Sequence, residues 1–317
     1  MVSEEVMSVY MRVREFCAAV DLGATNVRTA LVNRAGECAG FDERRVSGMS
    51  DGAEISSLIA EMLSFAAEAE GIRPAAVGIS TAGPVDLKTG AVVRSPNMHC
   101  GNIFLTRPLS AAFGVPAVMT TDCKAGALGE YTFGCAAKAD TLVYLTMSTG
   151  IGAGVLHKGE IFSGADGNAG EVGHLTVDTV YNVSCGCGGK GHWEAYASGS
   201  GIPRFFREWR KRRGLAGAGF LPDAKQILDA ANEGDRDSAD FVSELAAINA
   251  RGISSVICAY NPDLIVFDGP ILRGYAPLVL GEAERYLSLP RMQVTELGGR
   301  APLLGAAELA FRAVSST

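Results

Sequence analysis

Thiol, imidazole and carboxylate side chains are concentrated in a short stretch near the middle of the chain. They are Glu171, His174, Cys185, Cys187, His192 and Glu194. Thiolate sulfur and imidazole nitrogen are ligands that zinc prefers, and four protein ligands are typical of a closed structural site. A single residue separates Cys185 from Cys187, so a disulfide between them would be strained. The stretch therefore predicts a structural zinc site with two thiols and two imidazoles.

Two carboxylates remain once those four ligands are assigned. Glu171 precedes the first histidine and Glu194 follows the second. An ionised carboxylate accepts shorter and stronger hydrogen bonds than a neutral oxygen does, and a rigid metal loop would hold it in place. We therefore expect these carboxylates to bind adjacent hydroxyl groups of a sugar.

An apolar hairpin near the N-terminus has small and polar residues at its turn. Apolar runs at residues 16–20 and 29–32 flank the stretch Asp21-Leu-Gly23-Ala-Thr25-Asn26. Gly23 would let the turn approach a phosphate, while Thr25 and Asn26 offer donors to its oxygens. Asp21 would face bound magnesium. By itself such a turn can also be purely structural.

A second hairpin of the same kind follows at residues 142–156. Its turn consists of Ser148, Thr149, Gly150 and Gly152 between apolar runs. Two copies suggest an internal duplication and a pair of phosphate-binding turns. The glycine spacing, with no helix after it, does not fit a dinucleotide-binding fingerprint, and the chain has no P-loop.

An acidic residue lies where a strand meets a helix. The apolar run 116–121 predicts a strand, Asp122 follows it, and a helix is expected from residue 123. Ligands bind at the carboxyl ends of strands in open α/β sheets. An aspartate at this junction can also serve only as a helix N-cap, and the local residues leave both possibilities open.

Composition limits the kind of protein this can be. A chain of 317 residues is long enough for two domains, and its net charge of −7 argues against a protein dominated by contacts with nucleic-acid backbone. The eight cysteines are scattered apart from the close pair, so this is not a disulfide scaffold. No apolar run approaches the roughly 20 residues of a membrane span, and the first fifteen residues do not form a secretory signal. We expect a cytoplasmic protein with small-molecule partners and no membrane association.

The metal stretch resembles the signature of the ROK family, which comprises repressors, open reading frames and kinases. Glu171-Val-Gly-His174 is followed by a Cys-x-Cys-Gly-x-x-Gly-x-x-Glu run that ends at Glu194. The family usually has a third cysteine at the position of His192, but imidazole is an equally good zinc ligand. The resemblance extends from about Phe16 to the C-terminus. It implies an α/β, two-lobed actin/hexokinase-like (ribonuclease H-like) fold with the active site in the interlobe cleft.

The expected domains follow from this resemblance. Residues 1–15 form an N-terminal extension, residues 16–122 with 301–317 a small lobe, and residues 123–300 a large lobe. Small residues around Gly305 would let the last helix pack closely against a neighbour.

After Glu194 the pattern is helical. A basic run at 204–213 lies beside aromatic residues, which favours a solvated face of an amphipathic helix over a nucleic-acid site.

The resemblance also assigns roles to individual residues. Asp122, in the motif Asp122-x-x-Ala-Gly-Ala-Leu-Gly-Glu130, matches the family's catalytic base. The implied sugar-binding residues are Gly83, Asn97, Thr121, Asp122, Glu171, His174 and Glu194. The implied nucleotide-binding residues are Asp21, Gly23, Thr25, Asn26, Ser148, Thr149, Gly150, Gly152 and Gly269. The expected zinc ligands are His174, Cys185, Cys187 and His192. Pro270 departs from the family's glycine-rich turn over adenosine.

Together these features predict an ATP-dependent sugar kinase that uses magnesium, contains structural zinc and forms a dimer or tetramer. Thr121 stands where many family kinases have asparagine and can make fewer hydrogen bonds. We therefore favour phosphorylation of the 6-hydroxyl of glucose, with N-acetylmannosamine or N-acetylglucosamine as the alternative. A sugar-sensing repressor would need a DNA-binding domain before the first hairpin, where only twenty residues lie. A non-catalytic sugar-binding protein is a further alternative, but it would not need Asp122.

Overall fold

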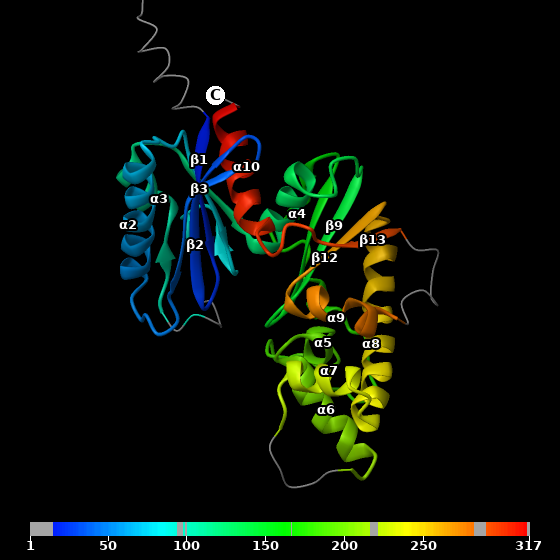
Figure 1. Cartoon of the computed structure of the whole chain (residues 1–317). Helices are drawn as coiled ribbons and strands as arrows, with labels where there is room; N and C mark the ends of the chain where they lie inside the picture. The colour runs from blue at the N-terminus through cyan, green and yellow to red at the C-terminus, as the bar shows by residue number, and fades with distance from the viewer. Residues whose placement is uncertain are drawn as a thin grey trace, which may run out of the picture. The chain divides into compact units, whose positions relative to one another are not determined.

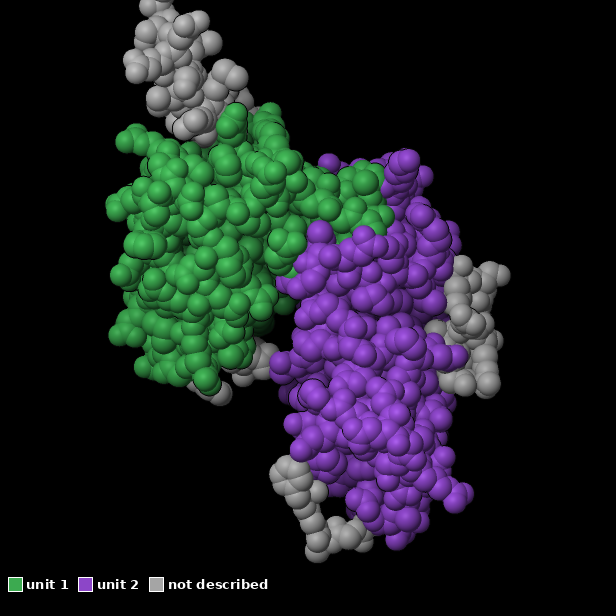
Figure 2. All heavy atoms as spheres, viewed as in Figure 1, with its two compact units in different colours: residues 1–137, 300–317 green, residues 138–299 purple. Residues whose placement is uncertain are grey.

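The computed structural model describes residues 15–93, 98, 100–165, 167–215, 221–281 and 290–315. The chain forms two compact units, which Figure 2 shows in different colours. Unit 1 comprises residues 1–137 and 300–317, and unit 2 comprises residues 138–299. The first boundary therefore lies after residue 137, whereas the sequence-based division lies after residue 122.

A five-stranded mixed sheet forms the centre of unit 1. Its strands are β1 (Phe16–Leu22), β2 (Asn26–Asn33), β3 (Cys38–Arg45), β4 (Val77–Thr81) and β8 (Ala117–Thr121). They lie in the order β3-β2-β1-β4-β8. The strands β1, β4 and β8 are parallel, and β2 and β3 complete an antiparallel meander with β1. The three parallel strands therefore end at one edge of the sheet.

Helices cover both faces of this sheet (Figure 1). Helices α2 (Gly52–Glu70) and α3 (Thr106–Phe113) pack on one face, and α10 (Ala301–Ser315) packs on the other. The Asp51 side chain caps the start of α2 by accepting the N–H of Ala53, and Gly71 ends it with a φ of 64°. An aspartate at the N-cap and a glycine after the last turn are the residue types typical of helix ends. A small three-stranded sheet joins β4 to α3 and contains β5 (Val85–Asp86), β6 (Ala91–Val92) and β7 (Ile103–Phe104).

Close packing of small residues explains why the boundary differs from the expected one. Helix α4 (Asp122–Phe133) packs along α10. A side chain at Gly305 of α10 would overlap the carbonyl of Ala125 in α4, and one at Gly129 of α4 would overlap the carbonyl of Ala301. Because only glycine permits this approach, α4 and α10 form one packed pair. Helix α4 therefore belongs to unit 1.

Unit 2 repeats the sheet of unit 1. Its strands are β9 (Thr141–Met147), β10 (Ile151–His157), β11 (Glu160–Ile161), β12 (Leu264–Asp268) and β13 (Arg291–Val294). Their order is β11-β10-β9-β12-β13, with β9, β12 and β13 parallel and the other two strands antiparallel. Strand order and direction are the same as in unit 1. The structure therefore agrees with the internal duplication inferred from the two hairpins.

One short helix of unit 2, η1 (Val172–His174), lies within the metal stretch. The helices that come after it are α5 (Glu194–Ala197), α6 (Gly201–Arg212), α7 (Ala224–Asn232), α8 (Arg236–Tyr260) and α9 (Pro270–Leu280). Among the described residues, α8 is the one helix long and apolar enough to cross a membrane. More than half of its apolar window is buried inside the protein. Packing in the core of unit 2 accounts for its apolar composition.

The basic run lies on α6 and covers part of the apolar core. Phe205, Phe206 and Trp209 are buried on this helix. The guanidinium of Arg212 lies 4.6 Å from the centroid of the Tyr181 ring, and that of Arg213 lies 4.4 Å from the Trp209 ring. These contacts favour the structural interpretation of the run.

Candidate active site and metal centre

Two carboxylates lie at the carboxyl edge of the parallel strands in unit 1. Asp21 is near the end of β1, and its backbone pairs in register with Ser80 of β4. The Ser80 hydroxyl donates to Asp21 Oδ1 over 2.9 Å. Asp122 follows the neighbouring strand β8, and its Oδ1 accepts the N–H of Cys123 over 2.8 Å. The fold therefore places the expected base and the expected magnesium-facing carboxylate on one edge.

Burial raises the pKa of both carboxyl groups. The pKa of Asp21 is raised to about 6, chiefly by desolvation and to a lesser extent by the negative charge of Asp122, although the Ser80 hydroxyl acts in the opposite direction. Desolvation also raises the pKa of Asp122, against the hydrogen bonds from Cys123. A carboxylate with a raised pKa is a stronger proton acceptor, which suits a general base.

The raised pKa of Asp21 predicts that Asp21→Asn stabilises the metal-free protein. The folded state favours the protonated form of Asp21. The stability that this carboxyl group contributes is therefore fully present below about pH 4 and is lost as the pH rises through about 6. At pH 7.5 the neutral amide avoids that loss, which is worth up to about 3 kcal/mol. We expect a higher Tm for the variant at pH 7.5, little difference at pH 4, and much weaker magnesium-dependent activity.

A matched control for this prediction is Asp42→Asn on β3, a half-exposed carboxylate of the same sheet that pairs with Arg44. Its Tm should stay close to that of the wild type at both pH values. If Asp21→Asn melts at or below the wild-type temperature at pH 7.5, Asp21 does not destabilise the metal-free protein.

The first phosphate turn, residues 23–26, is closed by a bond from the N–H of Gly23 to the carbonyl of Asn26 over 2.9 Å. Thr25 is exposed at its tip. The side-chain amide of Asn26 donates to Glu43 Oε1 over 2.6 Å, so it supports β3 as well as the turn. Arg28 lies 3.8 Å from Asp21 and 3.2 Å from Glu43. The sequence did not indicate these contacts, because they depend on the register in which β2 pairs with β1 and with β3.

The expected sugar-binding residues of unit 1 are partly brought together. Gly83 has room for a side chain, since a Cβ there would lie 3.7 Å from Cγ2 of Thr121. Thr121 immediately precedes Asp122 at the end of β8. Asn97 lies outside the described residues.

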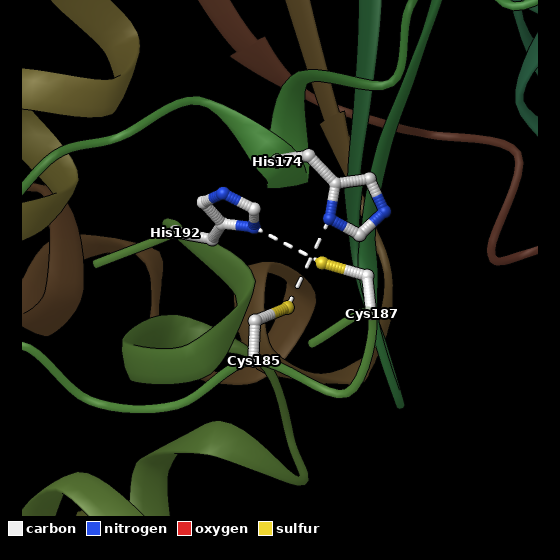
Figure 3. A group of neighbouring side chains, drawn as sticks. All are labelled: His174, Cys185, Cys187 and His192. Carbon is white, nitrogen blue, oxygen red and sulfur yellow. Dashed lines mark hydrogen bonds between the residues drawn. The ribbon is translucent and has the colours of Figure 1, made fainter. Parts of the chain in front are cut away.

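The four predicted zinc ligands converge in unit 2 (Figure 3). The ligand atoms of His174, Cys185, Cys187 and His192 all lie within 4.8 Å of one another. His174 Nδ1 is 3.8 Å from Cys185 Sγ, and His192 Nδ1 is 3.2 Å from Cys187 Sγ. Ligands around tetrahedral zinc are about 3.4 to 3.8 Å apart. The donor set and its spacing therefore fit zinc, and the four side chains would complete its coordination.

The loop that carries the four metal ligands, residues 174–192, is called the metal loop. It is shaped by glycines and by one buried carboxylate. Gly188 and Gly191 have φ values of 91° and 72°, and a side chain at Gly191 would overlap the carbonyl of Asp178. Asp178 accepts the N–H groups of residues 180–182 and the hydroxyl of Tyr196 over 2.7 Å. Desolvation opposes its charged form, but these hydrogen bonds outweigh it and lower the pKa of Asp178.

His174 connects the metal ligands to Glu171. Its Nδ1 faces the thiol of Cys185, whereas its Nε2 lies 3.9 Å from Glu171 Oε2. The side chain of Glu171 is 62% exposed. A histidine that binds metal through one nitrogen presents the other in a fixed orientation. Glu171 and His174 are therefore placed to bind hydroxyl groups together.

The second phosphate turn, residues 148–151, joins β9 to β10. The N–H of Ser148 donates to the carbonyl of Gly150 over 2.9 Å, while Thr149 is exposed. Gly152 pairs with Thr146 inside the hairpin, so it lies beyond the turn itself. Gly269 has a φ of 92° and packs against the backbone of Met147, where a Cβ would overlap the carbonyl. The expected adenosine turn and phosphate turn therefore lie side by side.

Glu194 lies between the metal ligands and this turn. Its Oε2 accepts the N–H of Ile151 over 3.1 Å, and its Oε1 is 3.9 Å from Cys185 Sγ. Sequence reasoning assigned this carboxylate to the sugar alone and missed its bond to the turn.

Sequence reasoning also missed Ser80, Asp178 and Tyr196. Of these, only Asp178 had a local signal, because an aspartate before a short loop is typical of an Asx turn.

Comparison with known proteins identifies relatives of this chain. The ROK family model matches residues 17–313. A glucokinase from Pyrobaculum calidifontis is 35% identical over 300 residues, which is 92% of this chain and 94% of the relative. A solved ROK hexokinase from Thermus thermophilus has a TM-score of 0.83 at 29% identity, covering 95% of this chain and 100% of that one.

A second solved structure contains bound ligands. It is a ROK family glucokinase from Streptomyces griseus in complex with glucose and AMPPNP, with a TM-score of 0.74 at 28% identity. The match covers 94% of this chain and 99% of that one. These neighbours have the actin/hexokinase-like fold expected from the sequence. Since the family model and both structures match nearly the whole chain, the protein belongs to the ROK family.

Proposed function

We propose that this chain is an ATP-dependent glucokinase, which transfers the γ-phosphate of ATP to the 6-hydroxyl of glucose. Similarity to glucokinases over more than nine-tenths of the chain supports this activity. The observation that carries the proposal is the pair of half-buried, desolvated carboxylates, Asp21 and Asp122, at one edge of the unit 1 sheet. A protein that only sensed a sugar would not need two desolvated acids with raised pKa values side by side.

In unit 1, Asp122 is assigned the role of general base, which accepts the proton of the attacking hydroxyl. Its raised pKa supports that role. Asp21 is assigned to bound magnesium, which neutralises charge on the nucleotide phosphates. The first phosphate turn would contribute its backbone and Thr25, whereas the Asn26 side chain chiefly holds Glu43. Gly83 and Thr121 would contact the sugar.

In unit 2, the second phosphate turn and Gly269 are assigned to ATP. Glu171 and His174 would accept or donate hydrogen bonds to sugar hydroxyls, with Glu194 beside them. Zinc, bound by His174, Cys185, Cys187 and His192, would be structural, because four protein ligands leave no position for water. Its contribution is to fix the orientation of His174.

A panel of sugars tests the substrate assignment. With ATP and magnesium, we expect the highest kcat/KM for glucose, since Glu171 and His174 would bind free hydroxyls and the short Thr121 side chain would make one hydrogen bond where asparagine makes two. A site built around a hydroxyl discriminates by up to ~10⁴-fold against an analogue that lacks it. The analogues to compare are N-acetylmannosamine and N-acetylglucosamine, in which an acetamido group replaces the 2-hydroxyl, and mannose, which keeps that hydroxyl with the opposite configuration.

Two results would revise the proposal in different ways. A kcat/KM for an N-acetylhexosamine well above that for glucose would change the substrate but leave a sugar kinase. Absence of phosphate transfer to every sugar, in protein that is folded and metal-loaded, would contradict the kinase itself. Assembly into a dimer or tetramer, a cytoplasmic location and the absence of nucleic-acid partners stay predictions.

A further inference from the structure

A short segment, residues 194–200, connects the metal loop to helix α6. It begins with α5 and ends with Ser198, Gly199 and Ser200. Ala195, Tyr196 and Ala197 are buried, and the Tyr196 hydroxyl binds both Asp178 and the N–H of Val183. The segment is therefore anchored in the core of unit 2 and can serve as a fixed support for what it touches.

This segment binds the second phosphate turn at several points. The N–H of Gly199 donates to the carbonyl of Ser148 over 2.7 Å, and the Ser200 hydroxyl donates to the carbonyl of Thr149 over 2.9 Å. The Glu194 carboxylate accepts the N–H of Ile151 from the opposite end of the segment. Three consecutive peptide groups of the turn are thus held by one short stretch of chain.

Arg204 of α6 reinforces the contact made by Ser200. Its Nε donates to the Ser200 carbonyl over 2.8 Å, and one of its terminal nitrogens donates to the Ser200 hydroxyl over 3.0 Å. A hydroxyl has one donor and two acceptor sites. Arg204 donates a hydrogen bond to the Ser200 hydroxyl oxygen. The hydroxyl hydrogen is therefore free to be donated to the carbonyl of Thr149. Charge-assisted donation also polarises the chain of hydrogen bonds.

These bonds fix the direction of the donors in the turn. In a trans peptide the C=O and the next N–H point in opposite directions. Holding the carbonyls of Ser148 and Thr149 against the segment therefore directs the N–H groups of Thr149 and Gly150 away from it. Within the described part of the chain, neither N–H has a protein acceptor. Successive N–H groups aimed outward form a concavity that binds phosphate oxygens.

We propose that Ser200 and Glu194 are positioning residues for the nucleotide: they hold the second phosphate turn in its phosphate-binding shape and link it to the metal loop. The inference rests on the proposed function, because it assumes that this turn binds ATP. It gives Glu194 a second role in addition to sugar binding. It also assigns a role to Ser200 and Arg204, which have no place in the proposed chemistry.

The test is nucleotide binding without sugar. Purified protein is titrated with a non-hydrolysable ATP analogue and magnesium by calorimetry, and glucose is titrated separately. Ser200→Ala should weaken the analogue about 3- to 10-fold, since one hydrogen bond is lost. Its glucose dissociation constant should stay within about twofold of the wild type. Ser200→Thr keeps the hydroxyl and should bind the analogue nearly as well as the wild type.

Arg207→Ala provides a matched control on the same helix. Arg207 is exposed on α6, and its side chain lies 4.0 Å from Glu208, away from the turn contacts. Removing this charge should change the affinity for the analogue by less than about twofold. An equal loss in Arg207→Ala and Ser200→Ala would indicate a general electrostatic effect, and it would contradict the positioning role.

The Glu194 contact has its own pair of variants. Glu194→Gln keeps an oxygen that can accept the N–H of Ile151, whereas Glu194→Ala does not. The alanine variant should bind the analogue about 10-fold more weakly, and the glutamine variant should restore most of the affinity. The metal content of the glutamine and alanine variants should be equal. A difference in their affinity for the analogue then does not come from loss of metal.

Gly150→Ala tests the same contact without changing the carboxylate. A Cβ at Gly150 would overlap Glu194 Oε2 and displace it. The effects of Gly150→Ala and Glu194→Ala should therefore be less than additive in the double variant. Strict additivity would contradict the proposed link.

The outcomes separate the two proposals. If the wild type does not bind the ATP analogue, the proposed kinase function fails. If the wild type binds it and both Ser200→Ala and Glu194→Ala bind it equally well, the kinase stands and the positioning role is wrong. Ser200 is exposed, so its substitution should leave the fold intact, which a melting curve verifies.

Discussion

Replacing Asp122 by asparagine should reduce kcat by about 10² to 10⁴-fold while the affinity for glucose changes only a few-fold. General-base catalysis contributes a factor of this size. An amide keeps the shape of the side chain, and its oxygen can still accept the N–H of Cys123, which now binds Oδ1. It cannot accept the proton of the sugar hydroxyl. Steady-state kinetics together with glucose titration separate the loss of chemistry from a loss of binding.

A second carboxylate at a helix start offers a control for Asp122→Asn. Asp51 caps α2 in the same unit by accepting the N–H of Ala53 over 2.8 Å. Asparagine caps helices as well as aspartate does, so Asp51→Asn should leave both stability and turnover nearly unchanged. The structure does not make Asp122 the helix N-cap, because α4 begins at Asp122 and its N-cap is Thr121, which makes no side-chain cap bond. If Asp122→Asn keeps its turnover as Asp51→Asn does, Asp122 is not the base, and its carboxylate serves only the bond to Cys123.

The pH dependence of the wild type should reflect the same burial. Desolvation raises the pKa of Asp122, so the base is lost by protonation at a higher pH than an exposed aspartate would be. We expect kcat/KM to fall on the acid side. The raised pKa of Asp21, about 6 in the metal-free protein, adds to this fall because magnesium must displace its proton.

Local patterns predicted the parts of the fold whose causes are local. The two hairpins were evident from apolar runs on either side of small-residue turns, and their sheets have the same strand order. The caps of α2 follow directly from Asp51 and Gly71. The metal cluster was predictable because all its ligands lie within a short stretch, from His174 to His192, and their chemistry is specific to few metals.

Contacts between distant residues could not be predicted in this way. The boundary of unit 1 depends on Gly305 packing against Ala125, and nothing in either local sequence specifies that pairing. The bond from Asn26 to Glu43 likewise depends on how β3 pairs with β2. Glu194 shows the same limit, because its carboxylate binds the N–H of Ile151, in a segment that precedes it by more than forty residues.

The resemblance to a family identified residue types but not their geometry. It indicated Glu171, His174 and Glu194 as one sugar-binding group. The structure adds a contact that sets Glu194 apart: Glu171 lies by His174, whereas Glu194, 3.9 Å from the thiol of Cys185, also accepts the N–H of Ile151 in the phosphate turn. The difference arises because Glu194 begins α5, whose direction is set by the buried Tyr196 and its bond to Asp178.

Metal removal should have the other large effect, on both stability and activity. Elemental analysis of the purified protein should find about one zinc per chain. Cys185→Ala leaves three ligands, and because binding energy at a structural site is also folding energy, we expect its Tm to fall by about 5 to 10 °C and its zinc content to drop. His192→Ala should act in the same direction. Activity should fall even at temperatures where the variant is still folded, since His174 and Glu194 both depend on the metal loop for their orientation.

His192→Cys distinguishes a zinc site from a cluster that is only packed together. A thiolate replaces imidazole readily as a zinc ligand, so zinc content, Tm and activity should stay near those of the wild type. If the histidine served only to contact His174, whose ring centroid is 5.5 Å away, the smaller thiol would lose that contact and stability would fall without any change in metal. Wild-type protein that contains no zinc and melts at the same temperature with and without a chelator would contradict the metal site. Retention of zinc and stability in His192→Cys, with loss of both in His192→Ala, is the expected result, because the position requires a ligand and not a particular side chain.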